Sequence, residues 1–378
     1  MKTVKILLFV TISLFALLLV SCTGTARPTD GWSGATIHDS TIYVGTSDGR
    51  LIAIDAATKN RKWEYTINPP TTIYATPIVS GDLVYVGSYN GEIYALSIAD
   101  GESIWVYPPK GEGYIGAVVG SPVIANGIIY TSSSDGKVYA LNTTNGKPKC
   151  ETDRPLADKL WTSPTVMGDN VYVSTFDGHI YTLSAEKLKL LDWSFKSEAG
   201  FASSPVICED TDTIFLGSFD RHLYAVKIGS NISAWRFPPE RPAGNWFWAS
   251  PIVNEGIVYA GCLDGRLYAI DATTGEEIWS YLTEDENGKP SPIVSSPVLM
   301  DDLLIAVNES GTVNVFDLAG ALANEGVPLW TASIGADVRS SFCAQEGLVY
   351  IRGEDNQLYI VDIDNRQVSQ SISLTVEA

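Results

Sequence analysis

The chain has 378 residues, enough for two ordinary domains or one large repeat array. Hydrophobic residues make up 45% of it and charged residues only 18%, which excludes a disordered chain. The formal net charge is −19 and no Lys/Arg cluster offsets it, so the surface repels phosphates and we expect no nucleic-acid partner. The 33 glycines and 18 tyrosines are typical of strands joined by tight turns.

The N-terminus has the pattern of a targeting segment. Two lysines precede an apolar run over residues 6–20, which is short for a membrane-spanning helix but has the length of a signal-peptide core. The run ends in Leu19-Val20-Ser21-Cys22, which resembles the bacterial lipobox, whose Cys is acylated. We therefore expect a signal peptide over residues 1–21, lipidation of Cys22 and a flexible tether over residues 22–30. An ordinary signal peptide with a chance Cys is the alternative.

The remaining cysteines are far apart in the chain. They are Cys150, Cys208, Cys262 and Cys343, and they fall in different repeats at irregular spacings. Disulfides are possible in an exported protein, but this spacing favours free thiols. No close Cys/His cluster predicts a zinc site.

One pattern recurs eight times along the rest of the chain. Its copies begin at Ile42, Val84, Ile129, Val171, Ile214, Val258, Leu304 and Val349. A proline recurs ahead of six copies, at Pro77, Pro122, Pro164, Pro205, Pro251 and Pro297, in steps of 45, 42, 41, 46 and 46 residues. A repeat of this length indicates a stacked or radial array, in which one unit cannot bury its own apolar faces.

Each repeat is predicted to form four strands. The first strand follows the proline, which costs no ladder N–H at that place. The second and third are joined by a two-residue turn such as Asp135-Gly136, whose residues tolerate the positive φ of a tight hairpin. Four antiparallel strands per repeat indicate the blades of a β-propeller. We therefore predict an all-β, eight-bladed, monomeric propeller over residues 31–376, closed so that few sheet edges are exposed.

The fourth strand of most repeats carries a tryptophan. These residues are Trp63, Trp105, Trp193, Trp235, Trp279 and Trp330, whereas Cys150 and Gln370 stand at the same place in the third and eighth copies. Large aromatic side chains at one repeat position are expected to fill the gaps between neighbouring blades.

The repeat resembles a known family. Val258 to Tyr281 reads VYAGCLDGRLYAIDATTGEEIWSY, and this hairpin-plus-Trp pattern is similar to the PQQ-like (quinoprotein) β-propeller repeat over residues 32 to 374. The family includes quinoprotein dehydrogenases and non-enzymatic propellers. Among the latter, the BamB-like lipoproteins of outer-membrane assembly resemble this chain in length, repeat count and lipobox, which implies an envelope scaffold.

The sequence does not carry the marks of the family's enzymes. The resemblance implies that those enzymes hold a quinone and Ca²⁺ at the channel mouth, often with a disulfide between adjacent cysteines, and this chain has no adjacent Cys pair. Its recurrent aspartates, at Asp48, Asp135, Asp177, Asp220 and Asp264, are interpreted as turn formers. His179 and His222 follow two of those turns and are interpreted as solvated, because Lys or Arg stands there in other repeats. We expect no catalytic residue, no metal and no cofactor.

A candidate binding surface lies three residues before the prolines, where the innermost strands should begin. Around the ring this position is Trp32, Tyr74, Val119, Trp161, Ala202, Trp248, Val294 and Arg339. The aromatic members and Arg339 are our candidate site, with Phe201, Trp246 and Phe247 as neighbours, because aromatic residues are enriched at binding hot spots. The alternative is that these rings plug the channel or pack between blades.

Three functions remain open. The favoured one is a non-enzymatic, lipid-anchored scaffold that binds protein partners in the cell envelope, as the resemblance implies for outer-membrane protein assembly. The second is a sensor that binds a small molecule or glycan at the aromatic mouth. The third is a PQQ-dependent dehydrogenase.

Overall fold

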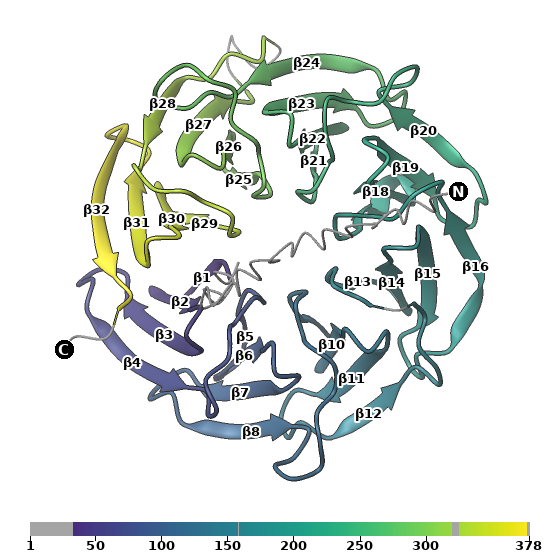
Figure 1. Cartoon of the computed structure of the whole chain (residues 1–378), viewed down its shortest axis with the longest axis vertical. Helices are drawn as coiled ribbons and strands as arrows, with labels where there is room; N and C mark the ends of the chain where they lie inside the picture. Colours follow the sequence, from purple (N-terminus) through teal and green to yellow (C-terminus); the bar gives the residue numbers. More distant parts are fainter. Residues whose placement is uncertain (1–32, 158, 320–324, 376–378) are drawn as a thin grey trace, which may run out of the picture.

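The computed structural model describes residues 33–157, 159–319 and 325–375. They form eight four-stranded antiparallel sheets, arranged as blades around a central axis (Figure 1). This confirms the predicted eight-bladed propeller. The predicted signal peptide, Cys22 with its tether, and Trp32 lie outside the described residues. The described part of the chain has no helix that is long and apolar enough to cross a bilayer.

The blades follow one another along the chain, and each is built from four consecutive strands. Blades 1 to 4 comprise β1 (Ala35–His38), β2 (Thr41–Gly45), β3 (Arg50–Asp55), β4 (Arg61–Thr66); β5 (Ile78–Ser80), β6 (Leu83–Gly87), β7 (Ile93–Ser97), β8 (Ser103–Tyr107); β9 (Val123–Ala125), β10 (Ile128–Ser132), β11 (Val138–Asn142), β12 (Pro148–Glu151); β13 (Thr165–Met167), β14 (Asn170–Ser174), β15 (His179–Ser184), β16 (Leu190–Lys196).

Blades 5 to 8 comprise β17 (Val206–Cys208), β18 (Thr213–Gly217), β19 (Leu223–Lys227), β20 (Ser233–Phe237); β21 (Ile252–Asn254), β22 (Ile257–Gly261), β23 (Arg266–Asp271), β24 (Glu277–Leu282); β25 (Val298–Met300), β26 (Leu303–Val307), β27 (Thr312–Asp317), β28 (Trp330–Ser333); β29 (Cys343–Gln345), β30 (Leu348–Arg352), β31 (Gln357–Asp362), β32 (Gln367–Ser373). One 3₁₀ turn, Glu209–Thr211, joins β17 to β18.

The second and third strands of each blade form its buried middle. In blade 2, Val84, Tyr85 and Val86 of β6 pair with Leu96, Ala95 and Tyr94 of β7, and all six side chains are buried. Both faces of such a strand are covered because a neighbouring blade packs on each side, which explains the nearly continuous apolar runs. The fourth strand lies on the outer rim and is only half covered, as in β24.

The hairpin aspartates are turn formers, as predicted. Asp135 accepts a hydrogen bond from the Lys137 N–H (3.0 Å) and another from the Tyr139 hydroxyl (2.5 Å). Gly136 has a φ of +82° between them. Burial, together with this bond to a carboxylate, strongly raises the pKa of Tyr139 and keeps it a donor. Tyr224 and Tyr268 make the same bond to Asp220 and Asp264.

The outer-strand tryptophans join each blade to the next. The Trp63 indole N–H of blade 1 donates to the Ile98 carbonyl of blade 2 at 2.9 Å, and its ring lies against Gly101. A Cβ on Gly101 would come within 2.6 Å of that ring. The same arrangement recurs with Trp105 on Gly146, Trp235 on Gly275 and Trp279 on Gly326. The prediction that these aromatics fill the gaps between blades is therefore confirmed.

Where the tryptophan is missing, its partner changes too. Cys150 holds the tryptophan position in blade 3, and the glycine position in blade 4 is taken by Leu188, which is 1% exposed with a φ of +50°. In blade 8 the tryptophan position is taken by Gln370. The glycine position of the next blade, blade 1, is taken by Lys59, whose Nζ lies 5.9 Å from the Tyr350 ring centroid. A smaller side chain on one blade is thus matched by a larger one on the next, which keeps the junctions filled.

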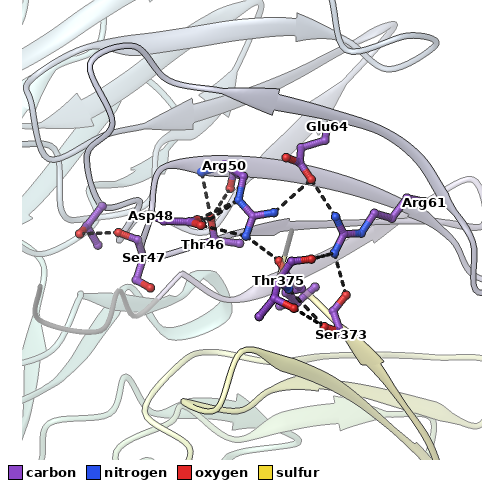
Figure 2. Close-up of polar contacts among 10 residues, drawn as sticks. Thr46, Ser47, Asp48, Arg50, Arg61, Glu64, Ser373 and Thr375 are labelled. Atoms are coloured by element: carbon purple, nitrogen blue, oxygen red, sulfur yellow. Dashed lines mark hydrogen bonds and ion pairs between the residues drawn. The ribbon is translucent and has the colours of Figure 1, made fainter. Parts of the chain in front are cut away.

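The ring closes between blades 8 and 1 through side chains, since each blade consists of consecutive strands (Figure 1). Arg50, 5% exposed, donates to the Leu374 carbonyl at 2.6 Å and to Glu64 at 3.1 Å (Figure 2). Arg61 donates to the Ser373 carbonyl at 2.9 Å. Beneath these bonds, buried aliphatic side chains of both blades, including Leu374, form one apolar cluster. The closure therefore combines hydrophobic burial with a buried guanidinium.

We expect Gly275→Ala to destabilise the protein more than Gly256→Ala. Both glycines lie in blade 6 with similar φ values, +75° and +78°, but an added Cβ meets the Trp235 ring at 2.7 Å in the first case and nothing within 4 Å in the second. The strained φ alone costs about 1 kcal/mol, and overpacking adds about 1–3 kcal/mol. Urea unfolding measures both variants, and equal losses would contradict the blade-joining role of the tryptophan contact.

Acid should weaken the closure through Asp48. Burial tends to raise the pKa of Asp48, but its hydrogen bonds with Arg50 and Thr46 outweigh this and lower it. A carboxylate with a lowered folded pKa stabilises the fold above its unfolded pKa of about 3.9 and loses that contribution as pH falls through the folded value. The stability gap between wild type and Asp48→Asn should therefore shrink below about pH 4. A gap that stays constant from neutral to strongly acidic pH would exclude this ion pair as its cause.

Candidate functional site

The residues that precede the innermost strands meet at one hollow. Tyr74, Trp161, Trp248 and Arg339 all line a cavity of about 150 Å³, and Val119, Ala202 and Val294 complete the described members of the ring. Because the innermost strands begin beside the central axis (Figure 1), one equivalent residue from each of blades 2 to 8 reaches the same mouth. Binding at this cavity stays a prediction.

A belt of hydroxyl groups from blades 2 to 8 lines the same cavity, two residues further along the chain than the mouth residues. Four of these serines accept a hydrogen bond from the equivalent backbone N–H of the preceding blade: Thr76 N–H donates to Ser121 Oγ (2.9 Å), Ser163 N–H to Ser204 Oγ (2.9 Å), Ser204 N–H to Ser250 Oγ (3.1 Å) and Ser250 N–H to Ser296 Oγ (3.0 Å). A serine that accepts in this way keeps its own hydrogen to donate into the cavity. The small hydroxyl residue that recurs before each proline is the feature of the sequence that could have predicted this belt.

Five rings form a continuous arc on one side of the mouth, which we call the aromatic arc: Trp161, Phe176, Phe219, Trp246 and Trp248. The ring centroids of Trp161 and Phe176 are 5.6 Å apart, those of Phe176 and Phe219 5.3 Å, and Phe219 lies 5.2 Å from Trp246 and 6.0 Å from Trp248. Most of these contacts are edge-to-face, and each is worth about 0.5–1.5 kcal/mol beyond burial. Trp246 is still 41% exposed. The arc is thus rigid but not covered.

Two members of the arc escaped the sequence analysis. Phe176 and Phe219 each precede the aspartate of a hairpin turn, where blades 1 and 3 carry Ser47 and Ser134. An aromatic residue at this otherwise variable turn position is the feature of the sequence that could have indicated both members of the arc. Tyr89 holds the equivalent place in blade 2, is 49% exposed, and contacts Tyr74 with a centroid distance of 5.3 Å.

The opposite side of the mouth is ionic. Arg339 donates to Glu309 of blade 7 at 2.7 Å, and its guanidinium lies 3.5 Å from Glu354 of blade 8. The hydrogen bond that Arg339 donates to Glu309 and the nearby carboxylate charges raise the pKa of Arg339, so it stays charged. The mouth therefore presents the aromatic arc on blades 4 to 6, a tyrosine pair on blade 2 and an ion-pair cluster on blades 7 and 8.

The prediction that Phe201 and Phe247 lie beside the mouth is wrong. Phe201 and Phe247 are fully buried between blades, where Phe201 lies 5.9 Å from Tyr224 and Phe247 lies 5.7 Å from Tyr268. Successive residues of an extended segment point to opposite sides, so the residue next to a mouth residue turns into the blade junction. Trp246, the third neighbour, does reach the surface of the arc.

The interpretation of His222 as solvated is also wrong, whereas His179 is half-buried. His222 is 7% exposed, and each histidine Nδ1 lies 3.3 Å from its turn aspartate, Asp177 or Asp220. In blade 5 the connection to the next blade folds over the turn, and the Ala243 N–H bonds to the Arg221 carbonyl. Chain segments distant in sequence therefore cover a position that the repeat alignment alone suggested was open.

The cysteines beyond the N-terminus are free thiols, as predicted: Cys150, Cys208, Cys262 and Cys343. Burial raises the pKa of Cys262 strongly and that of Cys343 to about 12, so neither supplies a thiolate near neutral pH. Within residues 33–157, 159–319 and 325–375 no group of three His, Cys, Asp or Glu side chains could hold a metal ion.

Fold, repeat and mouth together define an eight-bladed propeller of PQQ-like repeats. A family profile described as "Outer membrane protein assembly factor BamB" matches residues 23–237 and 152–371. The two matches span most of the chain, which therefore belongs to this family.

Individual relatives are of two kinds. The 1-butanol dehydrogenase (cytochrome c) of Thauera butanivorans is 28% identical over 33% of this chain, and the match spans about a fifth (19%) of that enzyme. Outer membrane protein assembly factor BamB of Shewanella oneidensis is 23% identical over 76% of this chain and 71% of its own length. The crystal structure of BamB from Moraxella catarrhalis has a TM-score of 0.67 at 13% identity, covering 87% of this chain and 93% of that one, which shows a shared fold.

Proposed function

We propose that this protein is a non-enzymatic interaction scaffold of the cell envelope that contributes to outer-membrane protein assembly. Its family supports the assignment, because the similarity to BamB of Shewanella oneidensis extends over 76% of the chain. The similarity to the dehydrogenase of Thauera butanivorans extends over 33% of the chain and about a fifth of that enzyme. A short match among repeat proteins is what a shared repeat alone produces.

The observation that carries the proposal is the aromatic arc beside the channel mouth. Its rings are partly exposed, contact one another, and are fixed on a rigid ring of blades. Tryptophan is enriched at interface hot spots because it offers a large apolar area with little side-chain entropy to lose. We infer that a segment of a partner protein lies over the arc, with the Arg339 cluster across from it.

The arc variant Trp161→Ala/Trp248→Ala should lose its partners while staying folded. Both rings are only partly buried, so the thermal midpoint should change little, whereas loss of two hot-spot rings should weaken capture at least about tenfold. Co-purification from detergent-solubilised envelopes measures capture. Tyr114→Ala is the matched control, because Tyr114 is 65% exposed and lies outside the arc.

Two results would contradict this proposal. Unchanged capture with a lowered thermal midpoint would mean that the rings only fill the channel. A quinone absorbance band after PQQ and Ca²⁺ are added, with alcohol-dependent dye reduction, would identify a dehydrogenase instead.

We also propose that the scaffold is held at a membrane through Cys22. The apolar run over residues 6–20 and Leu19-Val20-Ser21-Cys22 support this. Each buried acyl methylene contributes about 0.8 kcal/mol, so several chains bind a bilayer firmly. Cys22→Ala should move the protein from the detergent phase to the aqueous phase and abolish labelling by radioactive palmitate. A Cys22→Ala protein that still partitions into detergent would refute the lipid anchor.

A further inference from the structure

Three hollows that share lining residues follow one another from the outer rim of blade 4 to the channel mouth. The outermost, of about 290 Å³, is lined by Tyr181, Leu188 and Leu190 together with Pro155 and Leu156. The next hollow shares Pro155 and Leu156 and extends to Phe176. Phe176 also lines the mouth cavity beside Trp161. We call this surface the blade 3–4 track.

The track lies at the one junction where cysteine and leucine replace tryptophan and glycine. Leu188 is buried in the apolar cluster between blades 3 and 4. Blade 3 has no tryptophan on its fourth strand, so no indole ring covers the outer strands of blade 4. Tyr181 differs as well: Tyr139, Tyr224 and Tyr268 donate to their turn aspartates, whereas Asp177 is bonded by Thr175 and lies beside His179. Among the described residues the Tyr181 hydroxyl has no hydrogen-bond partner, so it can serve a ligand.

The wall of the track is held in place before anything binds. The connection from blade 3 to blade 4 is tied to blade 3 by three backbone bonds: Thr152 N–H to the Val138 carbonyl (3.0 Å), Leu156 N–H to the Gly136 carbonyl (2.8 Å) and Leu160 N–H to the Ser133 carbonyl (3.2 Å). A preformed groove costs little ordering entropy on binding.

Two cations flank the track in a chain of net charge −19. Arg154 and Lys159 are both exposed, and within the described ranges neither has a carboxylate in ion-pair distance. Asp153 and Asp177 also line the track without pairing with these cations. The Lys159 Nζ instead lies 5.5 Å from the centroid of the Trp161 ring, which places a positive charge at the point where track and mouth meet.

We propose that the blade 3–4 track binds an extended segment of a partner protein in which apolar and acidic residues alternate. In an extended chain, alternate side chains point to the same side. Apolar side chains would therefore enter the hollows at Leu156 and at Phe176, while the intervening carboxylates reach Arg154 and Lys159. This inference rests on the scaffold function proposed above and names the chemistry of its partner.

The test uses two fluorescent ten-residue peptides, one alternating Leu or Phe with Glu and the other with Lys in place of Glu. Anisotropy with the full-length protein should show the Glu peptide binding at least tenfold more tightly than the Lys peptide, and its affinity should fall as salt screens the charges. Arg154→Glu/Lys159→Glu should weaken binding of the Glu peptide at least tenfold. Lys110→Glu/Lys147→Glu makes the same change of charge at exposed sites outside the track and should leave binding unchanged.

Equal binding of the two peptides, no binding of the Glu peptide at millimolar concentration, or equal effects of the two double variants would overturn this inference. The same variants in the envelope co-purification separate it from the scaffold proposal. If wild type captures a partner and Arg154→Glu/Lys159→Glu captures it equally well, the track assignment fails and the scaffold stands. If wild type captures nothing, the scaffold proposal itself fails.

Discussion

The contact between an outer-strand tryptophan and the glycine turn of the following blade is the constraint on which the propeller depends. The indole N–H satisfies a carbonyl of the next blade while the ring covers a backbone that has no Cβ. Neither half is stable alone, because the ring would be exposed and the carbonyl unpaired. The paired change to Cys150 and Leu188 obeys the same rule, since the volume lost on one blade is supplied by the other.

Rigid junctions explain how a small site can arise at the centre of a large ring. The innermost strands are short, yet the serine belt ties blade 2 to blade 3 and links blades 4 to 7 in series, so separate chain segments hold fixed positions around one mouth. Side chains placed there differ from blade to blade without disturbing the scaffold. Aromatic rings gather on blades 4 to 6 and the Arg339 cluster on blades 7 and 8, which gives a symmetric fold an asymmetric surface.

Much of the architecture could be predicted because it is encoded locally. Asp-Gly turns, the proline steps and the tryptophan spacing predict strands, blades and their number, and the free thiols followed from cysteine spacing. The errors arose where distant segments meet. Arg50 and His222 are buried by chain that a repeat alignment does not place over them, and Phe201 turns into a junction beside a residue that faces the mouth. Phe176 belongs to the site because it contacts Trp161 of its own blade and Phe219 of the next, two residues that are distant from it in sequence.

The closure at blades 8 and 1 has a further consequence for how such a chain can vary. Because no described strand is exchanged between the first and last blades, every blade corresponds to one uninterrupted stretch of sequence. Duplication or deletion of such a stretch would add or remove a whole module without splitting any sheet. Circular permutation at a turn between two blades would likewise leave all eight sheets intact. The blade that comes first in the gene can therefore change while the arrangement of blades around the ring stays the same.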